Sequence, residues 1–300
     1  MSSRPTYRDL PDGCAWDVLD PDLGSLALLT PERVRAAAGL VRQGLRFPLD
    51  VPLGLIDPPL FGRGALQHDV FSLSPAVLDD KVDNFFLQGS TQWDGFGHFA
   101  HDRGFFGGRT TEQARDSAGV LAWTGAGIVG RGVLLDVARQ VPIPGDEAFV
   151  VTPTMLDETA AAQGVALEPG DICCVRLGWL SWYRSLDDAG RRTVSAASRA
   201  HPHLRTPGIG PGPDLAAWLW DHGVAALAVD NPAVEPVPTT AALPAGSGID
   251  DTAHARVLAL LGVPLGEFFD FDRLAHHCAE SRDYDFCFTS APLRLHGAGG

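Results

Sequence analysis

Three short apolar runs alternate with segments of helical spacing in the second half of the chain, and this alternation limits the available folds. The runs are GRGVLLDVA at residues 130–138, DICCVRLGW at 171–179 and AALAVDNP at 225–232. Short apolar runs bounded by glycine, proline or polar turn residues are typical of buried strands. We therefore expect three strands in this part of the chain.

Segments with helical patterns separate and follow these runs. Residues 152–165 begin with Thr152, which is suited to cap a helix N-terminus, and reach Gly164, which is suited to its C-terminal end. Residues 213–224 follow the same scheme and stop at Gly223. Further helices are expected at 30–45, 250–263 and 270–280, and a last strand at 284–295. The alternation predicts the α/β class with a mixed sheet.

Two segments lie outside this pattern. Residues 47–64 are rich in proline and glycine and predict irregular chain, so that residues 1–64 form an N-terminal extension that wraps the surface or a neighbouring subunit. Residues 184–212 predict a long loop, and loops of that length are often functional, for example as lids. No internal repeat divides the chain, so residues 1–300 are expected to form a single domain.

Composition excludes several classes of partner. Apolar residues make up 45% and charged residues 20% of the chain, as in soluble globular proteins. The net charge of −14 argues against nucleic acid and against an anionic membrane surface. The N-terminus carries no apolar signal stretch and no run approaches membrane-spanning length. The five cysteines show no CxxC spacing, and Cys173 and Cys174 are expected to be buried thiols. We expect a cytoplasmic protein.

The segment QGSTQWDGFGH, residues 88–98, concentrates groups that suit chemistry. Asp94 and His98 are four residues apart, so on a helical turn they share a face and can bind one divalent cation. A hydrogen-bonded pair without a metal is the alternative, because this spacing is common. Trp93 can wall an apolar pocket, and His101 either joins the same face or lies at its rim.

This segment resembles the signature His-x-Gly-Thr-His-x-Asp-x-Pro-x-His of the metal-dependent cyclase-like hydrolases, which include bacterial kynurenine formamidase and isatin hydrolase. Thr91, Asp94 and His98 match the signature, whereas Gln88 and Gln92 stand where the family has its first two histidines. Further blocks resemble the family in the same order along the chain. The resemblance implies a single α/β domain around a mixed, barrel-like sheet flanked by helices, assembled as a homodimer or homotetramer.

The resemblance also implies roles for two residues near the end of the chain. His254 matches the family's catalytic histidine, although a helix histidine bonded to its own neighbours is the alternative. Glu267 matches a late carboxylate ligand. Together with Asp94 and His98 it would hold one divalent ion. Glutamine offers only an amide oxygen, so this oxygen-rich set favours Mn²⁺ over Zn²⁺.

The remaining polar candidates are expected to orient substrate or water. Gln88 and Gln92 either complete the metal shell or hold a water. Asp230 and Asn231 end a predicted strand, where polar groups of α/β active sites often lie, but they are also common turn formers.

These features predict a metal-dependent hydrolase that cleaves a C–N or C–O bond in an amide, lactam, imide or lactone. The substrate is expected to be a small, apolar or aromatic molecule. Two alternatives stay open. One is a polyketide-type cyclase or dehydratase without net hydrolysis, because two histidines are replaced. The other is a non-catalytic ligand-binding protein that has lost the metal.

Overall fold

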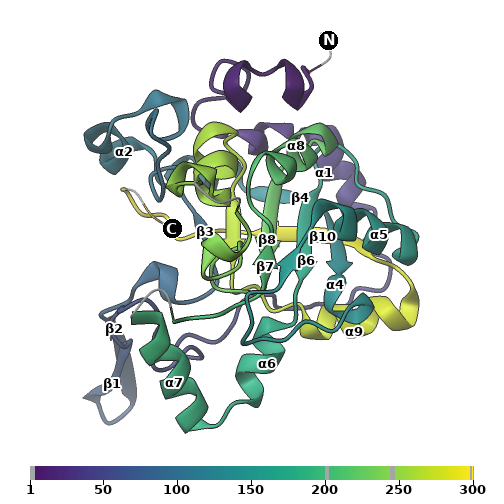
Figure 1. Cartoon of the computed structure of the whole chain (residues 1–300). Helices are drawn as coiled ribbons and strands as arrows, with labels where there is room; N and C mark the ends of the chain where they lie inside the picture. Colours follow the sequence, from purple (N-terminus) through teal and green to yellow (C-terminus); the bar gives the residue numbers. More distant parts are fainter. Residues whose placement is uncertain (1–3, 200–202, 244–246, 298, 300) are drawn as a thin grey trace.

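A six-stranded mixed sheet forms the centre of the computed structural model, which describes residues 4–199, 203–243, 247–297 and 299 (Figure 1). The strand order is β10-β4-β6-β8-β9-β3. The edge strands β10 and β3 pair antiparallel with β4 and β9, and the other pairs are parallel. In sheet order the strands span Asp285–Ser290, Ile128–Asp136, Ile172–Arg176, Ala226–Val229, Leu265–Glu267 and Gln92–Asp94. The predicted α/β class with a mixed sheet is confirmed.

Helices flank this sheet, and two of them end where the sequence predicts. Thr152 Oγ1 accepts a hydrogen bond from Met155 N at the start of α5, and Gly164 ends that helix in the left-handed conformation (φ 69°). Gly223 ends α8 in the same way (φ 70°). The helices are α1 Pro31–Ala38, α2 Thr111–Ser117, α3 Leu121–Ala126, α4 Val137–Gln140, α5 Pro153–Gln163, α6 Trp179–Ser185, α7 Asp188–Arg199, α8 Pro213–His222 and α9 Asp272–Ser281.

Shorter elements complete the fold. β5 (Val150–Val151) pairs in parallel with β7 (Gly208–Ile209) outside the main sheet. A π-helix spans His254–Leu260, and all of its residues except Arg256 are buried. Short 3₁₀ helices occur at Tyr7–Asp9, Pro11–Gly13, Ser25–Leu28, Leu87–Gly89, Phe106–Gly108, Thr239–Ala241 and Ile249–Asp251.

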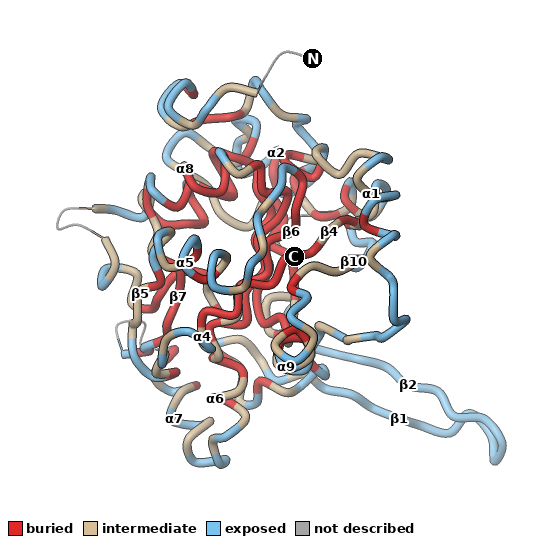
Figure 2. The backbone as a smooth tube through the Cα atoms, turned by 90° about the vertical axis from the view of Figure 1, so that its right-hand side faces the viewer, coloured by how far each residue is buried: buried red, intermediate tan, exposed pale blue. Residues whose placement is uncertain are grey.

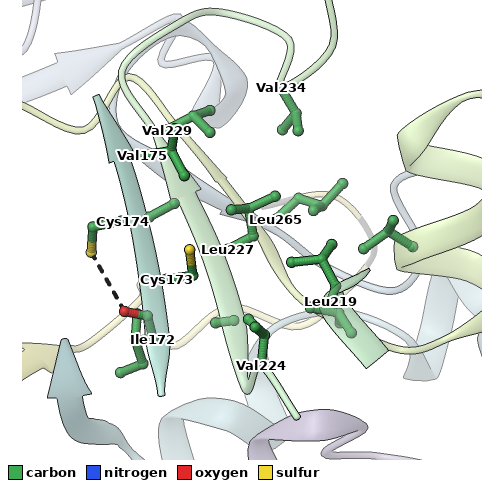
Figure 3. Close-up of a cluster of buried hydrophobic side chains, with 14 of the residues drawn as sticks. Ile172, Cys173, Cys174, Val175, Leu219, Val224, Leu227, Val229, Val234 and Leu265 are labelled. Atoms are coloured by element: carbon green, nitrogen blue, oxygen red, sulfur yellow. Dashed lines mark hydrogen bonds between the residues drawn. The ribbon is translucent and has the colours of Figure 1, made fainter. Parts of the chain in front are cut away.

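The core lies around the parallel strands, where the buried residues gather in Figure 2. Figure 3 shows side chains of β6 and β8 packed beside Leu219 of α8 and Leu265 of β9. Cys173 and Cys174 are fully buried, and the Cys174 thiol lies 3.8 Å from Ile172 O. The prediction of buried thiols is therefore confirmed, and burial raises the pKa of Cys174 far above its ordinary value.

The predicted long loop at 184–212 is wrong. Residues 184–185 end α6, residues 188–199 form α7 and residues 208–209 form β7, whereas residues 200–202 lie outside the described part of the chain. Helix α7 buries Ser195 and Ser198 instead of an apolar stripe, and Ser195 Oγ donates to Pro59 O (2.8 Å). Hydrophobic periodicity misses a helix that faces the protein through hydroxyl groups. The predicted helix at 30–45 likewise stops at Ala38.

A β-hairpin projects from the body of the molecule in both views (Figures 1 and 2). It consists of β1 (Gln67–Ser74) and β2 (Val77–Asp83), paired antiparallel, and every residue of both strands is exposed. Its exposed apolar side chains are Val70, Phe71, Leu73, Val77, Leu78 and Val82. A two-stranded hairpin is marginally stable alone in water, so an arm of this kind is suited to a partner chain. The expected homodimer or homotetramer stays a prediction.

The N-terminal residues pack on the main body. Leu10, Ala15 and Leu26 belong to the same buried cluster as the central strands, and Trp16 Nε1 donates to Ala259 O (2.8 Å). Treating 1–64 as a separate extension stays a prediction. No helix in the described part of the chain is long and apolar enough to cross a membrane.

Candidate active site

The three side chains of strand β3 point alternately to the two faces of the sheet. Antiparallel pairing places Gln92 opposite Glu267 of β9, and Gln92 Nε2 donates a hydrogen bond to Glu267 Oε2 (2.7 Å). Alternation puts Trp93 on the other side, where its Nε1 donates to Ser290 Oγ (2.9 Å). Asp94 therefore shares its side with Gln92 and Glu267, whereas Trp93 lies away from them.

Asp94 is fully buried and is held by a glutamine. Gln88 Nε2 donates to Asp94 Oδ1 (2.7 Å), and Gln92 Nε2 lies 3.2 Å from Gln88 Oε1. The two glutamines thus form a chain of amides that links Asp94 to Glu267. They stand at the positions where the family signature has histidine, and here they orient the two carboxylates.

His254, the first residue of the π-helix, lies between three carboxylates. Its Nδ1 is 3.0 Å from Glu235 Oε1. Its Nε2 is 3.3 Å from Asp94 Oδ2 and 3.4 Å from Glu267 Oε1. Residues from β3, from the segment after β8, from the π-helix and from β9 therefore meet at one imidazole. The predicted residues Asp94, His254 and Glu267 are close together in space.

The site has the donor atoms that a divalent cation needs. Asp94, His98 and His254 each provide one potential ligand atom, and these atoms all lie within 4.8 Å of one another. Gln92 Oε1 and Glu235 Oε2 are buried acceptors to which no described donor makes a hydrogen bond, and Asp94 Oδ2 has only His254 Nε2 close to it, at 3.3 Å. Buried acceptors without donors are costly, and a cation would satisfy them. The residues present therefore fit a metal ion.

Glu267 was expected to be a metal ligand together with Asp94 and His98. It is not among the three residues whose ligand atoms lie within 4.8 Å of one another, whereas His254 is. Glu267 Oε1 nevertheless lies 3.4 Å from His254 Nε2. The geometry thus allows His254 to be either a ligand or a proton carrier, with Glu267 beside it.

Protonation balances the negative charge of this cluster. Burial, together with the charge of Asp94, raises the pKa of Glu267 to about 8. Burial opposes the protonation of His254, but Glu235, Asp94 and Glu267 outweigh it and raise the pKa of His254 well above its ordinary value. Metal binding requires deprotonated ligands, so a cation would compete with these protons.

Asp230 and Asn231 make hydrogen bonds to the backbone. The Asp230 carboxylate accepts from Leu177 N (2.7 Å) and Gly178 N (2.8 Å), which fixes the turn after β6. Asn231 Nδ2 donates to Pro207 O (2.7 Å). Neither residue belongs to the cluster around His254. Their expected part in orienting substrate stays a prediction.

His101 belongs to a second group of potential ligand atoms, with Asp102 and Asp250. Its Nδ1 lies next to Asp102 Oδ1, and the Asp102 side chain is 66% exposed. Exposed acidic groups are commonly solvated without a metal. His101 does not belong to the group of Asp94, His98 and His254, and its expected part in the site stays a prediction.

A cavity of about 830 Å³ lies on the Trp93 side of the sheet. It is lined largely by apolar and aromatic side chains, among them Phe47, Trp93, Phe269 and Phe288. None of Asp94, His98, His254 or Glu267 lines it. Size alone therefore does not make this cavity the reaction site.

Glu235 is a functional candidate that the sequence patterns missed. It is 4% exposed and lies in NPAVEPVP, which has neither helical nor strand periodicity. Ile209 N donates to Val234 O (2.9 Å), so β7 holds the segment next to the site. The only signal in the sequence was its position shortly after the third apolar run.

Gly208 of β7 controls the position of Glu235. A Cβ atom at Gly208 would collide with the Glu235 carbonyl carbon and with Pro236 N. We expect Gly208→Ala to lower the free energy of unfolding by about 1–3 kcal/mol and to reduce turnover, because Glu235 must move away from His254. Urea denaturation and initial rates measure both effects. Gly125→Ala is the control, since a Cβ there meets nothing within 4 Å; equal effects in both variants would contradict this role.

Comparison with known proteins shows the family of this chain. The family described as "Putative cyclase" matches residues 49–236, which is more than half of the chain. The chain belongs to this family. The resemblance seen in residues 88–98 is therefore confirmed. No curated protein matches the chain.

Three solved structures have the same fold. A crystal structure of a novel cyclase is 30% identical over 95% of this chain and 96% of its own, with a TM-score of 0.77. An isatin hydrolase bound to the product analogue thioisatinate is 13% identical over 90% of this chain and 95% of its own, with a TM-score of 0.60. Isatin hydrolase A from Labrenzia aggregata, bound to benzyl benzoate, is 16% identical over 88% of this chain and 94% of its own, with a TM-score of 0.58.

Proposed function

We propose that this cyclase-family protein is a metal-dependent hydrolase. It cleaves a C–N or C–O bond in a small aromatic or apolar amide, lactam, imide or lactone. The observation that carries the proposal is the buried cluster around His254, in which Asp94 and His98 offer ligand atoms beside acceptors that have no donor. The names of the similar isatin hydrolases support an aromatic substrate.

Asp94 and His98 would hold the ion, with Glu267 next to them. Mn²⁺ and Zn²⁺ both suit this set, and the number of oxygen atoms favours Mn²⁺. When bound, such an ion lowers the pKa of water and polarises a carbonyl group. Gln88 and Gln92 keep the two carboxylates in place, and Gln92 Oε1 is left to accept a hydrogen bond from water or substrate.

His254 would carry the proton. Glu235 accepts a hydrogen bond from Nδ1, which fixes the ring and leaves Nε2 turned towards Asp94 and Glu267. A histidine oriented by a carboxylate can remove a proton from the attacking group and return it to the leaving nitrogen or oxygen. The burial of Asp94, Glu235, His254 and Glu267 strengthens these interactions by excluding water.

A second candidate function is ring formation or dehydration without net hydrolysis. The family description and the replacement of two signature histidines by Gln88 and Gln92 favour it. A non-catalytic binding protein is the third candidate, in which the metal has been lost because the glutamines replace the signature histidines. The three candidates differ in the mass of the product and in the metal content.

Metal content and product mass test the proposal together. Protein purified without chelator or metal-affinity resin is expected to contain about one Mn or Zn per chain by elemental analysis. In mass spectrometry, an aromatic lactam or lactone should give one product heavier by one water, and an acyclic aromatic amide should give two products whose masses sum to the substrate plus one water. A single product of equal mass, or lighter by one water, would establish the cyclase or dehydratase. No metal, also after dialysis against Mn²⁺ or Zn²⁺, and no turnover would contradict the hydrolase.

A further inference from the structure

Arg63 is a half-buried arginine next to the candidate site. Two consecutive residues before it, Phe61 (φ 56°) and Gly62 (φ 72°), have left-handed backbone conformations. Such a conformation is unfavourable for phenylalanine and persists only where the surroundings enforce it. Phe61 N donates to Ser198 Oγ of α7 (2.9 Å), which supplies one such contact.

The bend that carries Arg63 is fixed against the strand of Glu267. Leu60 is 1% exposed and belongs to the buried cluster that contains Phe268, the residue after Glu267. Thr91 Oγ1 donates to Phe268 O (2.6 Å), so the loop of residues 88–98 meets the same point. Arg63 is thus held close to both elements that supply the carboxylates.

The charge of Arg63 acts on the site without a direct ion pair. Burial lowers the pKa of Arg63, whereas the charges of Glu267 and Asp94 act in the opposite direction. Arg63 in turn helps to lower the pKa of His98. Yet no described carboxylate lies within 4 Å of its guanidinium, and its Cζ lies 5.1 Å from the centroid of the Phe61 ring.

Two other half-buried arginines, Arg176 and Arg184, pair with carboxylates. Arg176 is 2.9 Å from carboxylate oxygens of Asp136 and Asp272. Arg184 likewise contacts Asp270 and Asp272. A guanidinium presents a planar set of N–H donors that matches a carboxylate in bidentate geometry. Among the described residues, no carboxylate pairs with the N–H donors of Arg63 at the edge of the candidate site.

We propose that Arg63 is a specificity-determining residue that binds a carboxylate group of the ligand. The inference rests on the proposed function and deepens it, because it makes the ligand class an aromatic molecule that bears a carboxylate. The carboxylate is either present in the substrate or formed when an amide or lactone is hydrolysed. In both cases the ring packs near Phe61 and the anion faces the Arg63 guanidinium.

Benzoate and its neutral counterpart benzamide test this site directly. Isothermal titration is carried out on two samples of wild-type protein, one treated with EDTA and one saturated with Zn²⁺. In both, benzoate is expected to bind at least about tenfold more tightly than benzamide. Arg63→Gln should abolish the preference, and Arg63→Lys should restore only part of it. Arg191→Gln is the matched control, because Arg191 is also half-buried and stacked on a ring, with its Cζ 5.3 Å from the centroid of Tyr183.

The outcomes separate this inference from the hydrolase proposal. No benzoate preference in the wild type, or the same preference in Arg63→Gln, would overturn the role of Arg63 whatever the metal content. A preference in EDTA-treated protein that holds no metal supports Arg63 even if hydrolysis fails. In the active enzyme, if Arg63→Gln raises the KM for N-formylanthranilate but not the KM for formanilide, the carboxylate that Arg63 binds belongs to the substrate. If Arg63→Gln leaves both KM values unchanged and only weakens inhibition by benzoate, the carboxylate belongs to the product.

Discussion

Protein with Asp94→Asn is expected to lose its metal ion and its turnover together. Asp94 is fully buried, and its carboxylate is one of the three groups whose potential ligand atoms lie within 4.8 Å of one another, with Oδ2 3.3 Å from His254 Nε2. Asparagine keeps the shape and can still accept from Gln88, but it removes the charge that attracts a cation. Changes beside a metal ligand typically weaken metal affinity about 10–100-fold, so the loss of a ligand should exceed about 100-fold.

The loss should not be a folding defect. Asp94 helps to raise the pKa of Glu267, so removal of its charge relieves repulsion between the two carboxylates. Elemental analysis measures the metal content, initial rates measure turnover, and a thermal melt measures folding stability. Asp171→Asn is the control, since Asp171 is also buried but pairs with Arg131 (2.9 Å) outside the cluster. Full activity or a full metal complement in Asp94→Asn would refute the assignment.

His254→Asn is expected to keep the metal and to lose about 100- to 10,000-fold in turnover, the usual contribution of a general acid–base group. Asparagine can still donate to Glu235, so the buried carboxylate keeps a partner, but it cannot carry a proton. This split between metal content and rate distinguishes a proton carrier from a ligand. Metal loss in His254→Asn would make His254 the third ligand, which its place among the three converging ligand atoms also allows.

Glu235→Gln tests how His254 is held. Its Oε1 lies 3.0 Å from His254 Nδ1, and glutamine can keep this hydrogen bond without the charge. If Glu235 only orients the ring, turnover should fall much less than in His254→Asn, and the metal should stay. A loss as large as that of His254→Asn would mean that the charge of Glu235 itself takes part.

Much of the architecture follows from local signals. The apolar runs at 130–138, 171–179 and 225–232 contain β4, β6 and β8. Short runs of leucine, valine and other apolar residues favour strands that are buried in a sheet. Threonine and glycine set the ends of α5 because capping acts within one helical turn. Helix α7 was missed because its buried face carries serine hydroxyls.

The site divides in the same way. The sequence by itself determined which groups were available: a carboxylate and an imidazole four residues apart, two glutamines at signature positions, and a family likeness that singled out His254 and Glu267. Only the tertiary structure decided that Gln92 lies opposite Glu267, that Glu235 faces His254, and that Arg63 lies near them with no described carboxylate within 4 Å of its guanidinium. Side-chain patterns encode local conformation, whereas contacts between residues 63, 94, 235, 254 and 267 depend on strand register and on the packing of segments far apart in the chain.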